Sequence, residues 1–322
     1  MQAKTVVGPL DRVKILFQTS NPQFAKYTGN WFGALDAMRI IYRSDGTRGL
    51  FRGHSATLLA IFPKASIKFL AYEQARAVLI RDKSEENVIR RFLAGSIAGV
   101  TSVFFTYPLE VVRVRLAFET KGGTRASLSK ICRQIYFENP PQVRQSAASI
   151  PSNSAVVSAA SATASTVQSL TPASGLVNFY RGYWPTIGGM FVYAGTSFLA
   201  YDYSRDMLRQ PRLAPYTTVQ GSATPDKPAR LLGWSEYLAG GLAGFVSITA
   251  SYPLEVTRRR MQVSGAVGDG RRRGMVETAT RLYADKGWRG FFVGIGIGYV
   301  KQVPLSATSF FVYQKLKHYM NF

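Results

Sequence analysis

The chain has 322 residues, of which 46% are hydrophobic, a composition that excludes a protein disordered throughout. Its formal net charge of +22 indicates an anionic partner of one of three classes: a nucleic acid, a lipid surface or acidic small molecules. The single cysteine, Cys132, excludes a disulfide framework and a cysteine metal site. Since His54 and His318 also lie far apart in the sequence, we predict no metal site and no cofactor.

The first predicted helix contains "VVGPLDRVKILFQ", Val6–Gln18, in which Pro9 and three charged residues interrupt an apolar pattern. Proline kinks or ends a helix, and a charge in apolar surroundings needs a partner. This stretch by itself does not explain why either is present.

Two later apolar stretches, Phe92–Leu109 and Tyr237–Leu254, carry no charge and are rich in Gly, Ala and Ser. Small residues let helix backbones approach closely in a bilayer, which favours membrane helices. No plain run of about 18 apolar residues marks a membrane span, however. These stretches alone do not exclude the alternative, a tightly packed core helix of a soluble protein.

Three motifs recur in the same order along the chain, three times each. The first is "PLDRVK" at Pro9–Lys14, "PLEVVR" at Pro108–Arg113 and "PLEVTR" at Pro253–Arg258. The second is "DGTRGLFRG" at Asp45–Gly53, "SGLVNFYRG" at Ser174–Gly182 and "KGWRGFFVG" at Lys286–Gly294. The third is "YEQAR" at Tyr72–Arg76, "YDYSR" at Tyr201–Arg205 and "YQKLK" at Tyr313–Lys317. Such repetition predicts three copies of one structural unit.

Each unit is predicted to contain an apolar helix ending in the first motif, a short amphipathic helix and a second long helix. The short helices are expected at Asn30–Ser44, Arg125–Phe137 and Gly274–Asp285, and the second long helices at about Ser55–Ile80, Pro185–Leu208 and Ile295–Met320. A Ser- and Ala-rich insertion at 139–173 indicates a flexible spacer, and 210–230 a Pro-, Thr- and Gly-rich linker.

These motifs give the chain a resemblance to the mitochondrial carrier family over almost its whole length. The resemblance implies an all-α membrane protein: three tandem repeats, each of two transmembrane helices and a short matrix helix, form a six-helix barrel around a central cavity. It implies repeats at 1–82, 88–209 and 231–322, a location in the mitochondrial inner membrane, and transport instead of enzymatic catalysis. A polar cavity also explains the weak hydropathy signal, because the inner faces of such helices can be polar.

The first helix departs from the family pattern, in which it begins well before its proline. Only eight residues precede Pro9, which span about 12 Å at ~1.5 Å per residue. This length does not cross a hydrocarbon core of about 30 Å. We therefore expect the outer half of this helix to be missing from the sequence, through truncation or an incorrect start.

By resemblance, the first motif forms a gate on the matrix side. Its acid and base lie on one helix face, where an intrahelical pair contributes only ~0.2–0.5 kcal/mol. That gain is small for charges inside a bilayer, so each acid is expected to meet the base of a neighbouring repeat, with the prolines bending the helices inward. Gln18 and Gln262 are expected to brace these pairs, whereas Ala117 leaves the middle repeat without a brace. The predicted gate residues are Pro9, Asp11, Lys14, Gln18, Pro108, Glu110, Arg113, Pro253, Glu255, Arg258 and Gln262.

The third motif is expected to form the opposite gate, facing the intermembrane space. Its residues are Tyr72, Glu73, Arg76, Tyr201, Asp202, Arg205, Tyr313, Gln314 and Lys317. Gln314 stands where the other repeats have an acid, so one ion pair is lost. We expect the outer gate to be weaker than the matrix gate and to open more easily.

Family resemblance also places the substrate contacts midway along the second long helices. They are Ala60 in repeat 1, Gly189 and Met190 in repeat 2, and Lys301 and Gln302 in repeat 3. In this family, a glycine followed by an aliphatic residue at the second position marks adenine-containing substrates, because it offers a flat apolar surface to a base.

Cations surround these positions. Lys64 and Lys68 follow Ala60 at four-residue steps and share its helix face. Further expected contacts are Lys4, which matches a cavity lysine of adenine nucleotide carriers, Tyr193, which can stack on a base, and Arg259. The alternative for each lone lysine is a surface side chain. Because lysine is a usual partner of phosphate, the set favours a phosphorylated adenine compound.

We predict coenzyme A as the substrate, because "KTVVGPLDRVKILFQ", "FPKASIKFLAYEQ" and the insertion resemble the fungal coenzyme A carriers and the related Graves disease carrier proteins. The alternative is an ATP-Mg/phosphate or ADP exchanger of the same family. Against a strict ADP/ATP exchanger, "RRRMQV" at Arg258–Val263 lacks that carrier's further methionines. The expected partners are the substrate and inner-membrane lipid, namely cardiolipin, and a monomer suffices for alternating access.

Two rival classes fit less well. An enzyme is not indicated, because the sequence has no Gly-rich phosphate loop and no nucleophile–base arrangement. A helical repeat protein that binds nucleic acid fits the charge, but not the uncharged helices with internal prolines. We therefore expect no nucleic-acid partner.

Overall fold

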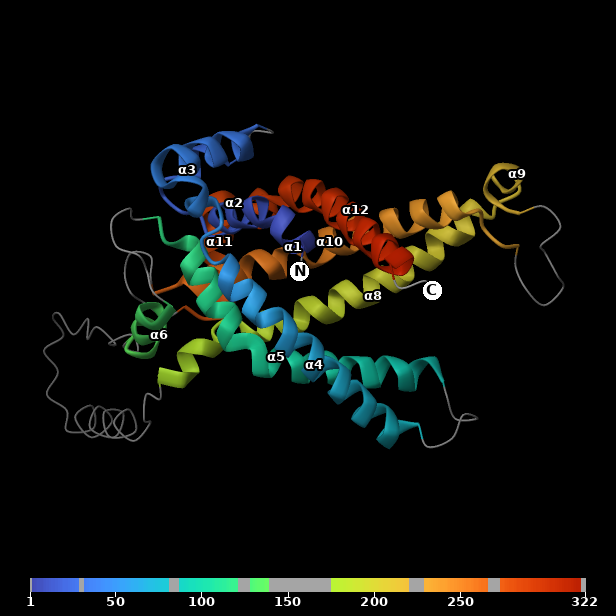
Figure 1. Ribbon diagram of the computed structural model, residues 1–322, viewed down its shortest axis with the longest axis horizontal. Helices are drawn as coiled ribbons and strands as arrows, with labels where there is room; N and C mark the ends of the chain where they lie inside the picture. The colour runs from blue at the N-terminus through green and yellow to red at the C-terminus, as the bar shows by residue number, and fades with distance from the viewer. Residues whose placement is uncertain are drawn as a thin grey trace, which may run out of the picture.

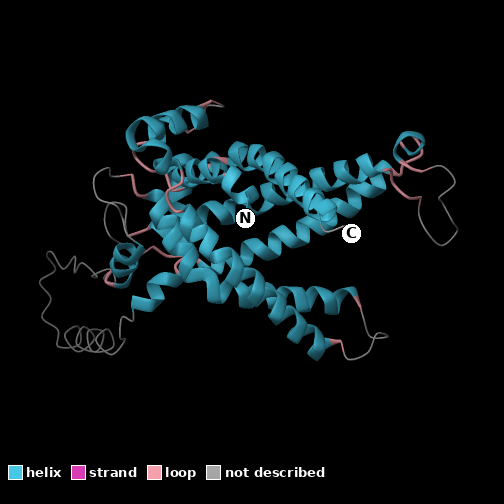
Figure 2. Ribbon diagram, in the orientation of Figure 1, coloured by secondary structure: helices cyan, strands magenta, loops and turns pink. Residues whose placement is uncertain are grey.

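The computed structural model describes residues 2–28, 32–80, 87–120, 128–138, 175–219, 229–265 and 273–319. Within these ranges the chain consists of helices joined by loops, with one isolated antiparallel bridge between Thr218 and Leu231 (Figure 2). This bridge and the four-residue helix α9, Ala214–Thr217, give local structure to the predicted linker. The insertion predicted at 139–173 lies outside the described residues.

Three units of the predicted kind follow one another along the chain. The motif-bearing helices are α1 Gln2–Val6 with α2 Gly8–Gln18, α5 Val88–Phe118 and α10 Gly233–Val263. The short helices are α3 Gly33–Leu50, α6 Leu128–Tyr136 and α11 Met275–Lys286, and 3-10 turns occur at η1 Ala25–Tyr27, η3 Gly175–Tyr180 and η4 Trp288–Phe292. The second long helices are α4 His54–Leu79, α8 Tyr183–Leu208 and α12 Ile295–Tyr319, within two residues of their predicted bounds.

The long helices come together at the end that carries α3, α6 and α11 and spread apart toward the other end (Figure 1). Helix α4 packs along α5, and α8 packs along α10, so the closest pairs join consecutive repeats.

Each short helix packs its apolar face on the motif-bearing helix of its own repeat. In repeat 1, Val13 and Leu16 of α2 contact Ile41 of α3. The corresponding clusters are Val111, Val112, Ile131 and Ile135 in repeat 2, and Tyr252, Val256 and Leu282 in repeat 3. Burial is therefore concentrated at the convergent end, where it fixes the positions of the motif residues.

Glycines begin the three second long helices. Gly53, Gly182 and Gly294 have φ of 84°, 80° and 81°, a conformation that side chains rarely adopt. A Cβ on Gly53 would lie 3.0 Å from the carbonyl of Arg113, and one on Gly182 would lie 3.1 Å from the carbonyl of Arg258. The last residue of the second motif thus permits a tight turn against the motif-bearing helix of the next repeat.

The three motif prolines act differently. Pro108 and Pro253 lie inside continuous helices, and α5 changes direction along its length (Figure 1). Pro9 instead stands in the first turn of α2, after a break at Val7, which has φ −90° and ψ 1°. At this position the structure has a break between two helices instead of a bend within one, and the proline lies in a first helical turn, where its missing N–H costs no helical hydrogen bond.

Large apolar side chains are exposed along the long helices. Examples are Phe62 and Phe69 on α4, Phe105 on α5, Leu199 on α8 and Phe311 on α12. Within the described residues, one stretch, Ile89–Phe118, is long and apolar enough to cross a membrane by its composition alone. Exposed apolar surface of this extent indicates a membrane-facing exterior.

Candidate functional site

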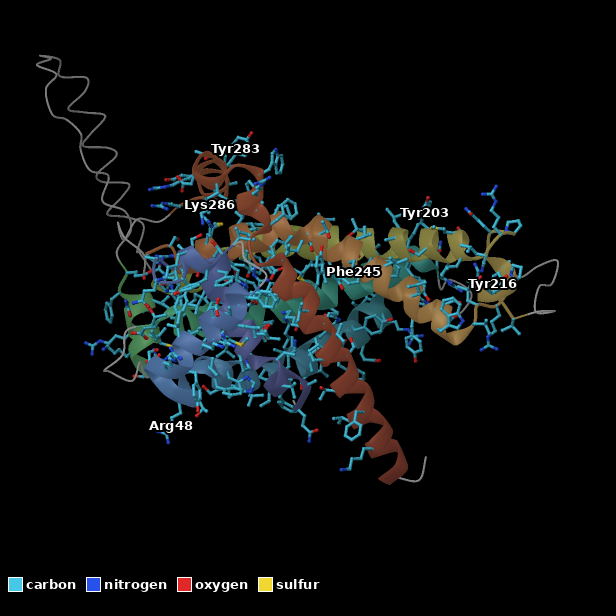
Figure 3. All side chains as sticks on the ribbon, turned by 90° about the horizontal axis from the view of Figure 1, so that it is seen from above. Arg48, Tyr203, Tyr216, Phe245, Tyr283 and Lys286 are labelled. Atoms are coloured by element: carbon cyan, nitrogen blue, oxygen red, sulfur yellow. The ribbon has the colours of Figure 1, made fainter. Side chains whose placement is uncertain are left out.

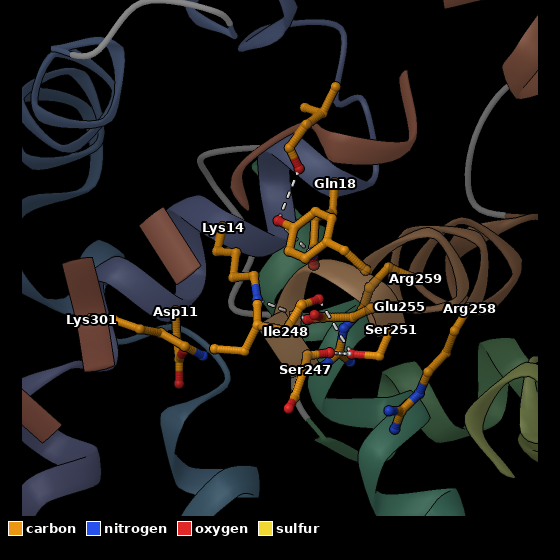
Figure 4. A network of polar contacts seen from close by, with 12 residues as sticks. Asp11, Lys14, Gln18, Ser247, Ile248, Ser251, Glu255, Arg258, Arg259 and Lys301 are labelled. Carbon is orange, nitrogen blue, oxygen red and sulfur yellow. Dashed lines mark hydrogen bonds and ion pairs between the residues drawn. The ribbon is translucent and has the colours of Figure 1, made fainter. Parts of the chain in front are cut away.

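A ring of ion pairs joins the motif-bearing helices of the three repeats where they converge, and Figure 4 shows its Lys14–Glu255 pair. Asp11 of α2 accepts from Arg113 of α5 at 3.2 Å. Lys14 of α2 donates to Glu255 of α10 at 2.9 Å. Glu110 of α5 pairs with Arg258 of α10, which closes the circle. We call these residues the ion-pair ring: Asp11, Lys14, Glu110, Arg113, Glu255 and Arg258.

Two further bases contact the ring. Lys301 of α12 donates to Asp11 at 2.8 Å, and Arg259 of α10 donates to Glu110 at 3.3 Å. Both were predicted as substrate contacts. The assembled cluster has five bases against three acids, so it carries excess positive charge. An anion in its vicinity would be attracted.

The ring is largely removed from solvent. The side chain of Lys14 is 7% exposed and that of Asp11 14%. Removing one partner of such a pair leaves a desolvated charge, a change that typically costs about 3–5 kcal/mol. The ring therefore holds the three helices together only while all of its members are paired.

Two tyrosines that the sequence reasoning missed support the ring. Gln18 Nε2 donates to Tyr252 Oη, and Gln262 Nε2 donates to Tyr107 Oη, each at 3.1 Å. Lys14 also lies over the Tyr252 ring, with Nζ 5.1 Å from the centroid. Each tyrosine immediately precedes a motif proline, so the repeated "YPLE" was the signal that could have found them.

The third joint, between repeats 1 and 2, lacks this tyrosine–glutamine bond. Gly8 precedes the proline of repeat 1, and Ala117 stands at the glutamine position of repeat 2. Both line a small pocket next to Phe51, and a Cβ on Gly8 would approach the Phe51 ring to 3.1 Å. A phenyl ring occupies the place that a tyrosine takes at the other two joints.

A cavity of about 950 Å³ opens above the ring between α5, α8 and α10. The predicted contacts Lys68, Gly189, Met190 and Tyr193 line it, together with Glu255 and Arg258 of the ring. Arg91, near the outer end of α5, also lines the cavity and was not predicted. The cavity thus combines a charged floor with a largely apolar wall.

Two of the four remaining predicted contacts lie near charges of the ring. Lys4 interacts electrostatically with Asp11 and Lys301, and Lys64 with Glu110 and Arg258. Ala60 is half-buried on α4. Gln302 is exposed on α12 and makes no hydrogen bond or ion pair to the described part of the chain.

Among the described residues, the acids of the third motif are not paired between repeats. Glu73 and Asp202 are exposed, and within the described ranges no ion pair joins either of them to another repeat. Arg205 lies over the ring of Tyr201, its own neighbour on α8, at 5.3 Å. Tyr72 is half-buried, and the side chains of Tyr313, Gln314 and Lys317 lie outside the described residues. The molecule is therefore closed at the ring and open at the other end.

Comparison with known proteins matches three segments, 1–83, 84–212 and 230–322, to the family described as "Mitochondrial carrier protein". The chain is 44% identical to "Mitochondrial carrier protein LEU5" of Saccharomyces cerevisiae, over 98% of this chain and 86% of the relative. It is 32% identical to "Solute carrier family 25 member 16" of Homo sapiens, over 99% of this chain and 85% of the relative. It is also 32% identical to "Mitochondrial carrier protein CoAc2" of Zea mays, over 98% and 82%.

Proposed function

The chain belongs to the mitochondrial carrier family, a family of transporters and not enzymes, and we propose that its own substrate is coenzyme A. Its relatives are multi-pass proteins of the mitochondrial inner membrane, and the chain is a protein of this kind. The observation that carries the proposal is a cavity with Gly189, Met190 and Tyr193 on its wall and with Glu255 and Arg258, two members of the positively charged cluster, at its floor.

Phosphate groups of the substrate would bind at the floor. Lys301 and Arg259 are the two bases that the ring holds beyond its three ion pairs. Lys64 lies within electrostatic reach of Glu110 and Arg258. Lys68 and Arg258 line the cavity itself, and Arg259 contacts the same Glu110 as Arg258, so this group of cations suits a ligand with several phosphates.

The adenine would lie against α8. Gly189, Met190 and Tyr193 of this helix line the cavity, so a base in the cavity would contact this part of α8. The Tyr193 ring is 44% exposed and available for stacking. The cavity volume of about 950 Å³ lies at the upper end of the range for small-molecule sites, about 300–1,000 Å³. A substrate larger than a simple nucleotide suits that volume.

Transport would follow from competition for Lys301. In the state described here, this lysine is the partner of Asp11. A substrate phosphate that binds Lys301 replaces Asp11 as its partner, and Asp11 then keeps only Arg113. Binding thereby weakens the ring and shifts the population toward a state open to the matrix, as differential binding requires. Because one chain surrounds the whole cavity, a monomer is the proposed transport unit; the cardiolipin contact stays a prediction.

Uptake into liposomes tests the proposal. Proteoliposomes containing the purified protein should accumulate labelled coenzyme A, and adenosine 3′,5′-bisphosphate should inhibit this uptake. Empty liposomes and the Lys301→Ala protein are the controls. If the liposomes take up ADP or ATP but no coenzyme A, the protein is a nucleotide exchanger and the proposal is wrong. If they take up neither coenzyme A nor a nucleotide, both hypotheses are contradicted.

A further inference from the structure

The cavity extends beyond the places that the proposed function gives to the phosphates and the adenine. On α5 its lining runs from Val100 to Ile89, eleven residues toward the outer end of this helix, which is about 16 Å at ~1.5 Å per residue. On α8 the lining continues past Tyr193 to Phe198. A substrate that contacts only the floor and the wall at Gly189 does not reach this part of the cavity.

The separation of two helix pairs creates this space. Helix α5 packs along α4 and α8 along α10, so each helix of repeat 2 packs mainly on a helix of another repeat. A Cβ on Gly99 would approach Met190 Cε to 3.2 Å, whereas a Cβ on Gly95, one turn further out, would meet no other atom of the described residues within 4 Å. Helix α8 continues toward Tyr203, at the opposite end from Lys286 (Figure 3). The open part of the cavity therefore begins beyond Met190 and leads outward.

The lining of this open part is mostly apolar. Apart from Arg91 and Ser96, the α5 residues that line the cavity are glycines or have apolar side chains. Such a lining offers no partner to a phosphate group, but it suits an uncharged chain. We call the following lining residues the outer groove: Phe92, Gly95, Ser96 and Gly99 of α5, and Ala194 and Phe198 of α8.

Coenzyme A carries an uncharged chain of this kind. Its pantetheine arm consists of methylene and methyl groups, amide groups and a terminal thiol, and it leaves the diphosphate on the side opposite to the adenosine. With the phosphates at the floor and the adenine against α8, the arm can turn back along α5 toward the outer end. Ser96 supplies a hydroxyl that can hydrogen-bond an amide of the arm.

We propose that the outer groove binds the pantetheine arm and thereby distinguishes coenzyme A from nucleotides that lack the arm. This inference rests on the proposed function, because it assigns a further part of the same substrate. The cations at the floor contact phosphates, which coenzyme A shares with ADP and ATP. The groove adds apolar contact in proportion to the surface that the arm removes from water, and this contact is specific to coenzyme A.

Binding of two ligands to the purified full chain in detergent tests the proposal. Coenzyme A and adenosine 3′,5′-bisphosphate share the nucleotide, but only coenzyme A has the arm. The wild-type protein should bind coenzyme A at least about tenfold more tightly, because the apolar contact of the arm is added. Gly95→Leu fills the groove, so it should raise the Kd for coenzyme A by about tenfold and leave the Kd for the bisphosphate unchanged.

A second variant and a matched control make the result independent of one helix. Ala194→Leu fills the same groove from α8 and should have the same selective effect. The control is Gly240→Leu on α10. Gly240 occupies the position of Gly95 relative to the motif proline, lies outside the cavity lining, and a Cβ on it would also meet no other atom of the described residues within 4 Å. Gly240→Leu should bind both ligands like the wild type.

Three results would overturn the proposal. If Gly95→Leu weakens the binding of both ligands equally, the glycine serves helix packing and not the arm. If the wild type binds the two ligands equally, or if both groove variants bind coenzyme A like the wild type, the arm does not contact the groove. Failure of the proposed function is seen separately, in the wild-type protein: proteoliposomes that take up ADP or ATP but no coenzyme A would refute the function and the arm site together.

Discussion

Asp11 is shared between two bases, Arg113 of α5 and Lys301 of α12. One carboxylate thereby links three helices from three repeats. The tyrosines before the motif prolines have a comparable role, since each combines a hydrogen bond from a glutamine with contact to a cation. Single side chains with partners in other repeats are therefore the sensitive points of this molecule.

Loss of the Lys301 ammonium tests the link between substrate and ring. Lys301→Ala should lower the initial rate of substrate uptake at least about tenfold, because a charged contact to phosphate is lost. Lys315→Ala, an exposed lysine on the same helix, is the matched control and should transport normally. Wild-type rates in a folded Lys301→Ala protein would show that the contact position is wrong.

Loss of the Gln262 amide tests the buried hydrogen bonds below the ring. Gln262 is the partner of both Tyr107 and Arg259. Gln262→Ala should cost about 1–3 kcal/mol of stability, since buried polar groups lose their partners, and thus lower the Tm by several degrees. The exposed Gln302→Ala variant should unfold like wild type. A Tm equal to that of this control would count against a bracing role.

At the scale of elements, α2, α5 and α10 meet at their convergent ends through the ion-pair ring and through a buried apolar cluster of Ile15, Val114 and Val263. Each acid lies on a different helix from its base, so the ring specifies which helices are neighbours. The short helices then hold the motif-bearing helices in place by apolar packing. The ion pairs therefore specify which helices are neighbours, and the apolar contacts provide most of the buried surface.

Exchanging the charges of Lys14 and Glu255 tests whether an ion pair specifies that α2 and α10 are neighbours. Lys14→Glu and Glu255→Lys should each lower stability by about 3–5 kcal/mol, because like charges then face each other in a buried site. The double exchange should recover part of the loss in thermal unfolding. Recovery should be incomplete, since Arg259 and Lys301 favour an acid at position 255. A double variant no more stable than the single ones would contradict a direct α2–α10 pair.

The whole molecule is closed at one end and open at the other. Its closed end has a complete ring, whereas Gln314 leaves the outer motif one acid short. Alternating access requires both ends to form and break in turn, so their relative stability sets how the two states are populated. Because the outer motif lacks one acid, the state that is closed at the matrix end and open at the outer end is favoured.

Placing an acid at position 314 tests the relative stability of the two ends. Gln314→Glu should stabilise the closed form of the outer end and slow substrate uptake a few-fold, because about 1 kcal/mol changes a population by that factor. Gln314→Ala should transport like wild type. Uptake that is equally fast in Gln314→Glu would mean that the outer end does not limit transport.

Much of the fold was predictable because its signals are local. A glycine marks the beginning of each of α4, α8 and α12, and the predicted bounds of these helices agree with the structure within two residues. Less local features were missed. Tyr107 and Tyr252 act on glutamines in other repeats, and Arg115 meets Glu138 from a different helix. No spacing within one helix indicates such partners.

The sequence by itself determined the threefold repeat, the order of helices and the residue types that face one another, because these follow from periodicity and turn chemistry along the chain. Only the tertiary structure decided which acid meets which base and that Asp11 also holds Lys301. Those outcomes depend on helix packing between residues far apart in the chain. Local pattern cannot specify that packing.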